Sequence, residues 1–227
     1  MGFFSRLFGA EAKPAAAAEP ATQMVDPQTL LYSLATIENQ WPATDESIPA
    51  RPKDLVLHED DWRQFEAVST NLADAVAAEL EDIRRIHAEK STPLKLPQGE
   101  FRAFTECHVR KRIPAPLPDA VRWADLLASC GVATSDVHRI TLRGATGVIP
   151  GSYSFQIGGL TLYGQREGEV VRLLCLDSTR SPAVPPERAA SFVAFLAQHN
   201  LIFVHWPSPT ILRGEDVSKY LVQRGTE

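Results

Sequence analysis

The chain has 227 residues, of which 44% are hydrophobic and 22% are charged, and its formal net charge is -5. These are ordinary values for a globular protein, so they exclude a wholly disordered chain and allow a sizeable hydrophobic core. The acidic balance argues against a general nucleic-acid binder, because affinity for a polyanion depends on cationic side chains that neutralise phosphates.

The three cysteines, Cys107, Cys130 and Cys175, are too few and too dispersed for a disulfide framework or a paired-cysteine zinc site. No apolar run approaches the ~18 to 20 residues that span a bilayer, and the start of the chain lacks the pattern of a secretory signal. Arginine outnumbers lysine, which is typical of GC-rich bacterial genomes. We therefore expect a bacterial, cytoplasmic protein with reduced thiols and no cofactor.

The first eight residues place an apolar group at helical spacing on one face, consisting of Phe3, Phe4, Leu7 and Phe8. Such a face suits a membrane interface or a hydrophobic groove on a partner protein. Alternatively, residues 1–8 fold back on their own domain or fray. The first interpretation predicts a weak anchor, with peripheral contact at the inner membrane.

The next stretch, residues 9–27, is rich in alanine, proline and glutamate. This composition predicts a disordered, flexible linker. We therefore expect an amphipathic tip, a linker, and then a single folded domain over residues 28–225.

The spacing of apolar residues predicts a short amphipathic helix over residues 28–37 and a long helix over residues 62–88. The acidic run from Glu59 to Asp61 precedes the long helix, where carboxylates stabilise free amide groups and the positive end of the helix dipole. With His58 this run also resembles a cluster of metal ligands. Because consecutive residues cannot converge on one ion unaided, we favour helix capping and predict no metal site.

Residues 101–112 alternate as in a strand, and the strand ends in the only compact basic run, Arg110, Lys111 and Arg112. Together with Arg102, this run can bind an anionic ligand. A solvated strand end explains the same residues.

The clearest structural signal is in residues 137–176, which contain strand-like runs at 137–142, 153–157, 160–165 and 169–176. Apolar residues alternate from Tyr153 onward, and Gly158 and Gly159 supply the positive backbone angles of a tight two-residue hairpin. The last run is apolar on both faces, so we expect an inner strand, with Arg172 as its exception.

Further helices are predicted at residues 118–131, 186–200 and 216–222, and a further strand is predicted at residues 201–206. We predict an α+β fold in which an antiparallel sheet, built on residues 137–176, is covered by the long helix and the helix after Pro186. A flexible N-terminal tail precedes it.

A thiol enzyme needs a histidine that activates the cysteine and a third group that orients the histidine. Cys175, His205 and Asp177 are the best such set, because the first two can lie on neighbouring strands. The competing interpretation is a buried core cysteine. Phosphate-loop, dinucleotide and hydrolase signatures are all absent from the sequence.

This lack of catalytic signatures favours a non-catalytic protein that binds another protein, with an inhibitor, immunity or secretion-accessory role as the specific form. Two alternatives stay open: a small cysteine-dependent hydrolase or transferase, and a binder of an anionic ligand.

Overall fold

The computed structural model describes residues 31–96, 99–111, 113, 115–177 and 184–223. The chain divides into two units after Leu30, and all described residues belong to the second unit, Leu31–Glu227. The predicted tip at residues 1–8 and the predicted linker at residues 9–27 therefore lie outside the described residues.

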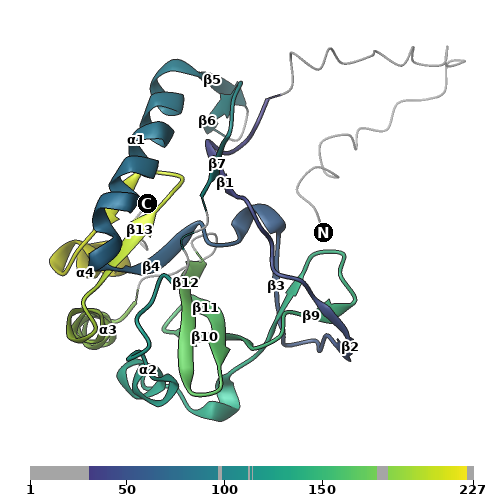
Figure 1. Ribbon diagram of the computed structural model, residues 1–227, viewed down its shortest axis with the longest axis vertical. Helices are drawn as coiled ribbons and strands as arrows, with labels where there is room; N and C mark the ends of the chain where they lie inside the picture. Colours follow the sequence, from purple (N-terminus) through teal and green to yellow (C-terminus); the bar gives the residue numbers. More distant parts are fainter. Residues whose placement is uncertain (1–30, 97–98, 112, 114, 178–183, 224–227) are drawn as a thin grey trace, which may run out of the picture. The chain divides into compact units, whose positions relative to one another are not determined.

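A six-stranded antiparallel sheet, with the order β10-β11-β12-β4-β13-β14, forms the centre of this unit (Figure 1). Its strands in chain order are β4 (Phe65–Ser69), β10 (Ser152–Ile157), β11 (Leu160–Glu167), β12 (Val170–Asp177), β13 (Leu201–His205) and β14 (Thr210–Leu212). The predicted α+β fold with an antiparallel sheet is confirmed. The prediction that the last run of residues 137–176 is an inner strand is also confirmed, because β12 lies between β11 and β4.

The hairpin between β10 and β11 has the predicted two-residue turn, since Ile157 pairs with Leu160. Tyr153 and Ile157 of β10 are buried, as their alternation predicts. Of the two turn glycines, Gly158 has the positive backbone angle, with φ of 66°, and Gly159 does not. The conformational freedom of glycine is therefore needed at Gly158.

The described α-helices are α1 (Ala73–Glu89), α2 (Trp123–Cys130), α3 (Pro186–Gln198) and α4 (Glu215–Gln223). Short 3-10 helices occupy Glu59–Asp61, Thr70–Leu72 and Thr134–Asp136. Helices α2, α3 and α4 pack on one face of the sheet, where their apolar residues and those of all strands except β14 form the largest core cluster. We call this the helix face. None of the helices in the described residues is long and apolar enough to cross a membrane.

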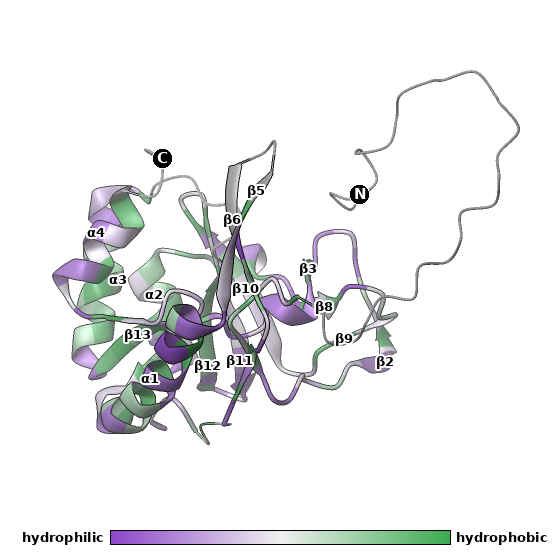
Figure 2. Ribbon diagram, turned by 90° about the horizontal axis from the view of Figure 1, so that it is seen from above, coloured by the Kyte–Doolittle hydropathy of each residue, from purple (hydrophilic) through white to green (hydrophobic). Residues whose placement is uncertain are grey.

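The opposite face of the sheet has two different covers. Helix α1 packs on β4 and β13 through a stripe that includes Leu80 and Ile83. Strands β3 (Leu55–Leu57) and β8 (Ile140–Leu142), with Trp62, pack on β11 and β12, where Tyr163 and Cys175 are fully buried. Figure 2 shows α2, α3 and α4 on one side of the sheet and β3, β8, β2 (Asp45–Pro49) and β9 (Gly147–Val148) on the other. We call the face of the sheet that α1, β3 and β8 cover the cleft face.

The remaining strands form two-stranded sheets. Parallel pairs are β1 (Thr36–Glu38) with β7 (His108–Arg110) and β3 (Leu55–Leu57) with β8 (Ile140–Leu142). Antiparallel pairs are β2 (Asp45–Pro49) with β9 (Gly147–Val148) and β5 (Ser91–Leu96) with β6 (Gly99–Phe104).

The predicted long helix at residues 62–88 is wrong in its first part. Residues Phe65–Ser69 form β4, and the α-helix begins only at Ala73. Strand β4 is buried on both faces, so its apolar residues do not alternate and their spacing also fits a helix. The acidic run Glu59–Asp61, which precedes β4, forms a 3-10 helix. The amide of Asp60 donates to Nδ1 of His58 at 3.2 Å.

Three further predictions of elements are corrected. Residues 31–37 of the predicted helix at 28–37 contain no helix and instead lead into β1, because pairing with β7 overrides the local spacing. The predicted strand at 101–112 is broken between β6 and β7. The first run of 137–176 supplies β8, which pairs with β3 and lies outside the central sheet.

Candidate binding cleft

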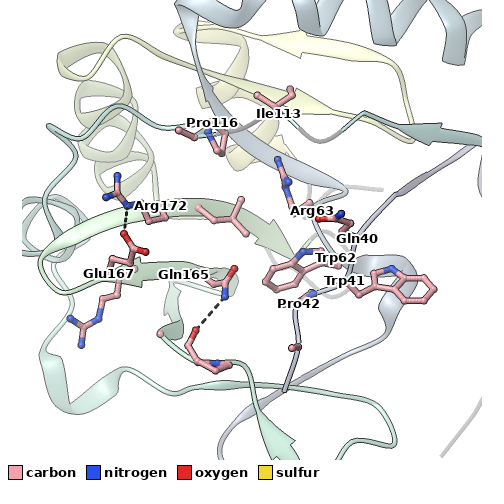
Figure 3. Close-up of a pocket in the computed structure, with 16 residues that line it drawn as sticks. Gln40, Trp41, Pro42, Trp62, Arg63, Ile113, Pro116, Gln165, Glu167 and Arg172 are labelled. Atoms are coloured by element: carbon pink, nitrogen blue, oxygen red, sulfur yellow. Dashed lines mark hydrogen bonds and ion pairs between the residues drawn. The ribbon is translucent and has the colours of Figure 1, made fainter. Parts of the chain in front are cut away.

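A cleft with a volume of about 850 Å³ lies beside β11 and β12 on the cleft face. Its walls come from segments that are distant in the sequence: 40–43, 62–63, the residues 113, 115 and 116, and then 150–151, 165–167 and 172–173. Figure 3 shows Arg172 and Glu167 on one side of the cleft and Trp41, Trp62 and Arg63 on the other. We call this feature the cleft.

Arg172 reaches the cleft because of a β-bulge. Gln165 pairs with Leu173 and Arg166 pairs with Val171, so Arg172 is an extra residue of β12 without a partner in β11. A bulge re-aims the side chain of the strand that carries it. Arg172 therefore lines the cleft together with its neighbour Leu173, although neighbouring residues of a regular strand point to opposite faces.

Two exposed carboxylates hold the guanidinium of Arg172. Its Nε lies 2.9 Å from Oε2 of Glu167, and Nη1 donates to Oδ1 of Asp119. The side chains of Glu167 and Asp119 are 76% and 84% exposed. Ion pairs this exposed contribute about 0 to 1 kcal/mol to stability, so another carboxylate can displace Glu167 or Asp119 at little cost.

The opposite wall contains a sharp backbone corner at Arg63, whose φ is 57°. The hydroxyl of Tyr163 fixes this corner, since it accepts from the amide of Arg63 at 3.1 Å and donates to the carbonyl of Asp61 at 2.9 Å. The ring of Trp62 packs on the ring of Tyr163 with centroids 5.8 Å apart. A buried strand residue thus holds the wall in a conformation that non-glycine residues rarely adopt.

The guanidinium of Arg63 is buried between two acids. Its Nε lies 2.8 Å from Oε2 of Glu66, and its Nη1 lies 3.3 Å from Oε2 of Glu38. Burial alone would lower the pKa of Arg63, but the carboxylates of Glu66 and Glu38 outweigh it and raise the pKa. The second oxygen of Glu66 accepts from Nε1 of Trp206 at 2.9 Å. Arg63 is therefore a fixed positive charge at the wall of the cleft.

Arg110 completes this buried network and is only 1% exposed. It donates to the side chain of Gln64 at 3.1 Å and to the carbonyl of Arg63 at 3.2 Å, and it lies over the ring of Trp206 at 5.1 Å. Oε1 of Glu38 and Nε of Arg110 are buried without a hydrogen-bond partner among the described residues. We call Glu38, Arg63, Glu66 and Arg110 the buried ionic network.

The predicted anion-binding residues are not brought together. Arg110 is buried in the network, Arg102 donates to the hydroxyl of Ser91 at 2.8 Å, and the exposed Lys111 lies 3.9 Å from Glu79. Arg112 lies outside the described residues.

Cys175 and His205 are also kept apart. Cys175 pairs with Glu66 and His205 pairs with Phe65, so the two side chains point to opposite faces of the sheet. Burial raises the pKa of the Cys175 thiol, which disfavours the thiolate that a nucleophile needs. Asp177 is the last residue of β12, beyond Cys175. This geometry argues against the cysteine mechanism, because the Cys175 thiol is fully buried in a core cluster with Tyr163 and Leu173.

The predicted anchor residues, Phe3, Phe4, Leu7 and Phe8, lie outside the described residues. Sequence reasoning missed Trp41 and Arg63 as site residues. Arg172 did carry a signal, since it is the exception in an apolar strand, but its partners Asp119 and Glu167 could not be identified without the fold.

The side chains that line the cleft are mostly polar, cationic and aromatic groups or prolines. Its described lining contains arginine, tryptophan, proline and glutamine side chains but no cysteine, histidine or serine. The described residues also contain no group of three or more His, Cys, Asp or Glu side chains that could hold a metal ion. Comparisons with protein-family models, with curated proteins and with solved structures find no match to this chain.

Proposed function

We propose that this chain is a non-catalytic protein-binding domain and that a segment of the partner protein binds in the cleft. One observation carries this proposal: irregular backbone is concentrated at the cleft. Within the described residues, Arg63, Ala115 and Asn200 are the non-glycine residues with positive φ, and the first two line the cleft. The bulge at Arg172 lies there as well.

Such conformations cost about 1 to 3 kcal/mol each and persist only where the surrounding structure enforces them. They cluster at ligand clamps, where a fixed wall reduces the entropy that binding must remove. The hydroxyl of Tyr163 and the acid Glu66 supply that enforcement at Arg63.

The buried ionic network supports the same proposal. Replacing a buried ion pair by apolar residues is often neutral or stabilising, because desolvation of the charges cancels their attraction. The network is therefore a weak source of stability. Its effect on the cleft is to fix the side chain and backbone of Arg63.

The side chains of the cleft suit an extended peptide. Trp41 is 47% exposed, and Pro42, Pro116 and Pro150 also line the cleft. Tryptophan and arginine are enriched where protein interfaces bind most strongly, and aromatic grooves bind extended proline-containing segments.

An inhibitor, immunity or secretion-accessory role in the bacterial cytoplasm is the specific form that we propose. In this proposal residues 1–8 provide a weak second attachment, to a membrane or to the partner. Removing them should abolish that attachment in fractionation and leave the melting temperature of the body unchanged. Unchanged localisation and partner binding would contradict the anchor.

The cleft is tested by substituting Trp41→Ala, with Tyr32→Ala as a matched control. Both residues are 47% exposed, but Tyr32 is not among the described residues that line the cleft. Affinity capture from cells that express the chain naturally, followed by mass spectrometry, should identify a protein that Trp41→Ala loses and Tyr32→Ala retains. Equal capture by both variants, or no captured protein, would contradict the proposal. Thermal melting checks that both variants fold.

A further inference from the structure

The charged groups that line the cleft are mostly cationic. Arg63, Arg166 and Arg172 line it, and Glu167 is the one acid among the described lining residues. Arg63 is already paired with two buried acids, and the guanidinium of Arg166 lies over the ring of Trp123 at 5.2 Å and donates to the carbonyl of Gly168 at 2.6 Å. Arg172 is therefore the guanidinium whose present partners are most easily exchanged.

Both carboxylate partners of Arg172 can leave its guanidinium at little cost in free energy. Glu167 and Asp119 are exposed carboxylates, and water can solvate either of them when it leaves the guanidinium. An incoming carboxylate would make the same charge-assisted hydrogen bonds beside an apolar surface, where water competes less. Leu173 and Pro116 provide that apolar surface.

We infer that the cleft recognises an extended peptide segment with one carboxylate side chain flanked by apolar residues. The carboxylate binds the guanidinium of Arg172 in place of Asp119 and Glu167, and the apolar residues pack on Trp41 and the prolines. This inference rests on the proposed function and names the chemistry of the segment.

A single carboxylate fits better than a strongly acidic tract. Arg63 and Arg110 are balanced by Glu38 and Glu66, and Asp119, Glu167 and Glu169 surround the two remaining arginines. The protein as a whole carries a net charge of -5. Long-range attraction is therefore weak, and recognition depends on short-range geometry at Arg172.

The test is selection from a displayed library of random nonapeptides on the full chain. Synthetic copies of the selected peptides are then measured by fluorescence polarisation. We expect an aspartate or glutamate at one fixed position, with apolar residues or proline beside it. Changing that acid to alanine should weaken binding about tenfold or more, as for other charge-assisted hydrogen bonds.

Variants of the protein then locate the contact. Arg172→Glu should weaken binding by about tenfold or more. Arg143→Glu is the matched control, an exposed arginine outside the cleft, and should leave affinity unchanged. Asp119→Ala removes a competitor for Arg172 and should tighten binding by up to about fivefold. This gain keeps the inference testable even if Arg172→Glu fails to fold.

The outcomes separate the inference from the proposed function. Peptides that lose binding to Trp41→Ala but contain no required acid would overturn the inference and leave the proposed function intact. A library that yields no peptide sensitive to Trp41→Ala would overturn both. A 12-nucleotide single-stranded DNA or phosphatidylserine vesicles that bind equally well through Arg172 would overturn the inference in favour of a phosphate ligand.

Discussion

The helix face and the cleft face of the sheet are built from the same strands and differ in what they bury. In β4, Phe65 points to the helix face, where its ring contacts the ring of Phe203 with centroids 5.0 Å apart. The next residue, Glu66, points to the cleft face and binds Arg63 and Trp206. One strand therefore supplies an apolar core on one side and a buried charge on the other.

This difference separates regular apolar packing from irregular, charged structure. Apolar burial on the helix face contributes about 25 cal/mol for each Å² removed from water. The buried hydroxyl of Tyr153 in this cluster donates to the carbonyl of Leu173 at 2.7 Å. The cleft face includes buried charges, positive φ values and a bulge, all of which cost free energy. Both faces contain apolar clusters that stabilise the fold, but the irregular backbone and the buried charges are on the cleft face, beside the cleft.

The largest expected effect is at the buried ionic network. Glu66→Ala leaves the guanidinium of Arg63 and Nε1 of Trp206 without their shared partner, so it should lower the free energy of unfolding by about 3 to 5 kcal/mol. Urea denaturation measures this loss. Glu81→Ala, which breaks the exposed pair with Arg84, is the control and should change stability by less than about 0.5 kcal/mol. If Glu66→Ala lowers the free energy of unfolding as little as Glu81→Ala does, the buried ionic network does not contribute to stability.

A smaller loss is expected on the helix face at Gly164. A Cβ atom at this position would lie 1.9 Å from the carbonyl oxygen of Leu173 and 2.8 Å from the hydroxyl of Tyr153. Because one of these atoms belongs to the backbone, Gly164→Ala should cost about 2 to 3 kcal/mol, at the upper end of overpacking effects. A melting temperature equal to that of the natural chain would show that the helix face is looser than its contacts indicate.

The hairpin turn provides a test of backbone strain away from both faces. Gly158→Ala should cost about 1 to 2 kcal/mol, because an L-residue resists the φ of 66°. Gly159→Ala, at the neighbouring position without a positive φ, should cost less. If the order of the two melting temperatures is reversed, the turn differs from the one described.

The smallest effect concerns the pH dependence of stability that comes from the ion pair between Asp54 and Arg139, which directly precede β3 and β8. Burial alone would raise the pKa of Asp54, but hydrogen bonds from Arg139 and from the amide of Arg51, together with the charge of Arg139, outweigh it and lower the pKa. The unfolded chain therefore binds this proton at higher pH than the folded chain. The pair's contribution of about 1 kcal/mol is present above about pH 4 and is lost as the pH falls through the folded pKa.

Asp54→Asn tests this sign. The variant should be less stable than the natural chain at pH 7, and the difference should shrink as the pH is lowered below about 4. Denaturant titrations at several pH values measure it. A difference that grows toward low pH would contradict the lowered pKa of Asp54.

Much of the central sheet could be predicted from local pattern. Strands β10, β11, β12 and β13 and helix α3 follow the expected runs, because each has a clear apolar period or a turn signal at its end. Strand β4 could not be recognised. Its burial on both faces removes the two-residue period, and the spacing of Phe65 and Val68 is equally compatible with a helix.

The cleft could not be predicted because its residues are adjacent only in space. Trp41, Arg63, Pro116 and Arg172 belong to four separate segments. Arg110 illustrates the opposite error: the basic run that contains it suggested an exposed anion site, but pairing of β7 with β1 buries its guanidinium beside Glu38.

The sequence by itself determined the α+β class, the two-residue hairpin and the apolar inner strand β12, since these depend on the alternation and turn chemistry of neighbouring residues. The tertiary structure alone decided the place of β4, the pairing of β8 with β3, and the burial or exposure of each arginine. The physical reason is that the solvation and partners of a charged side chain are set by segments far away in the chain, which no local period encodes.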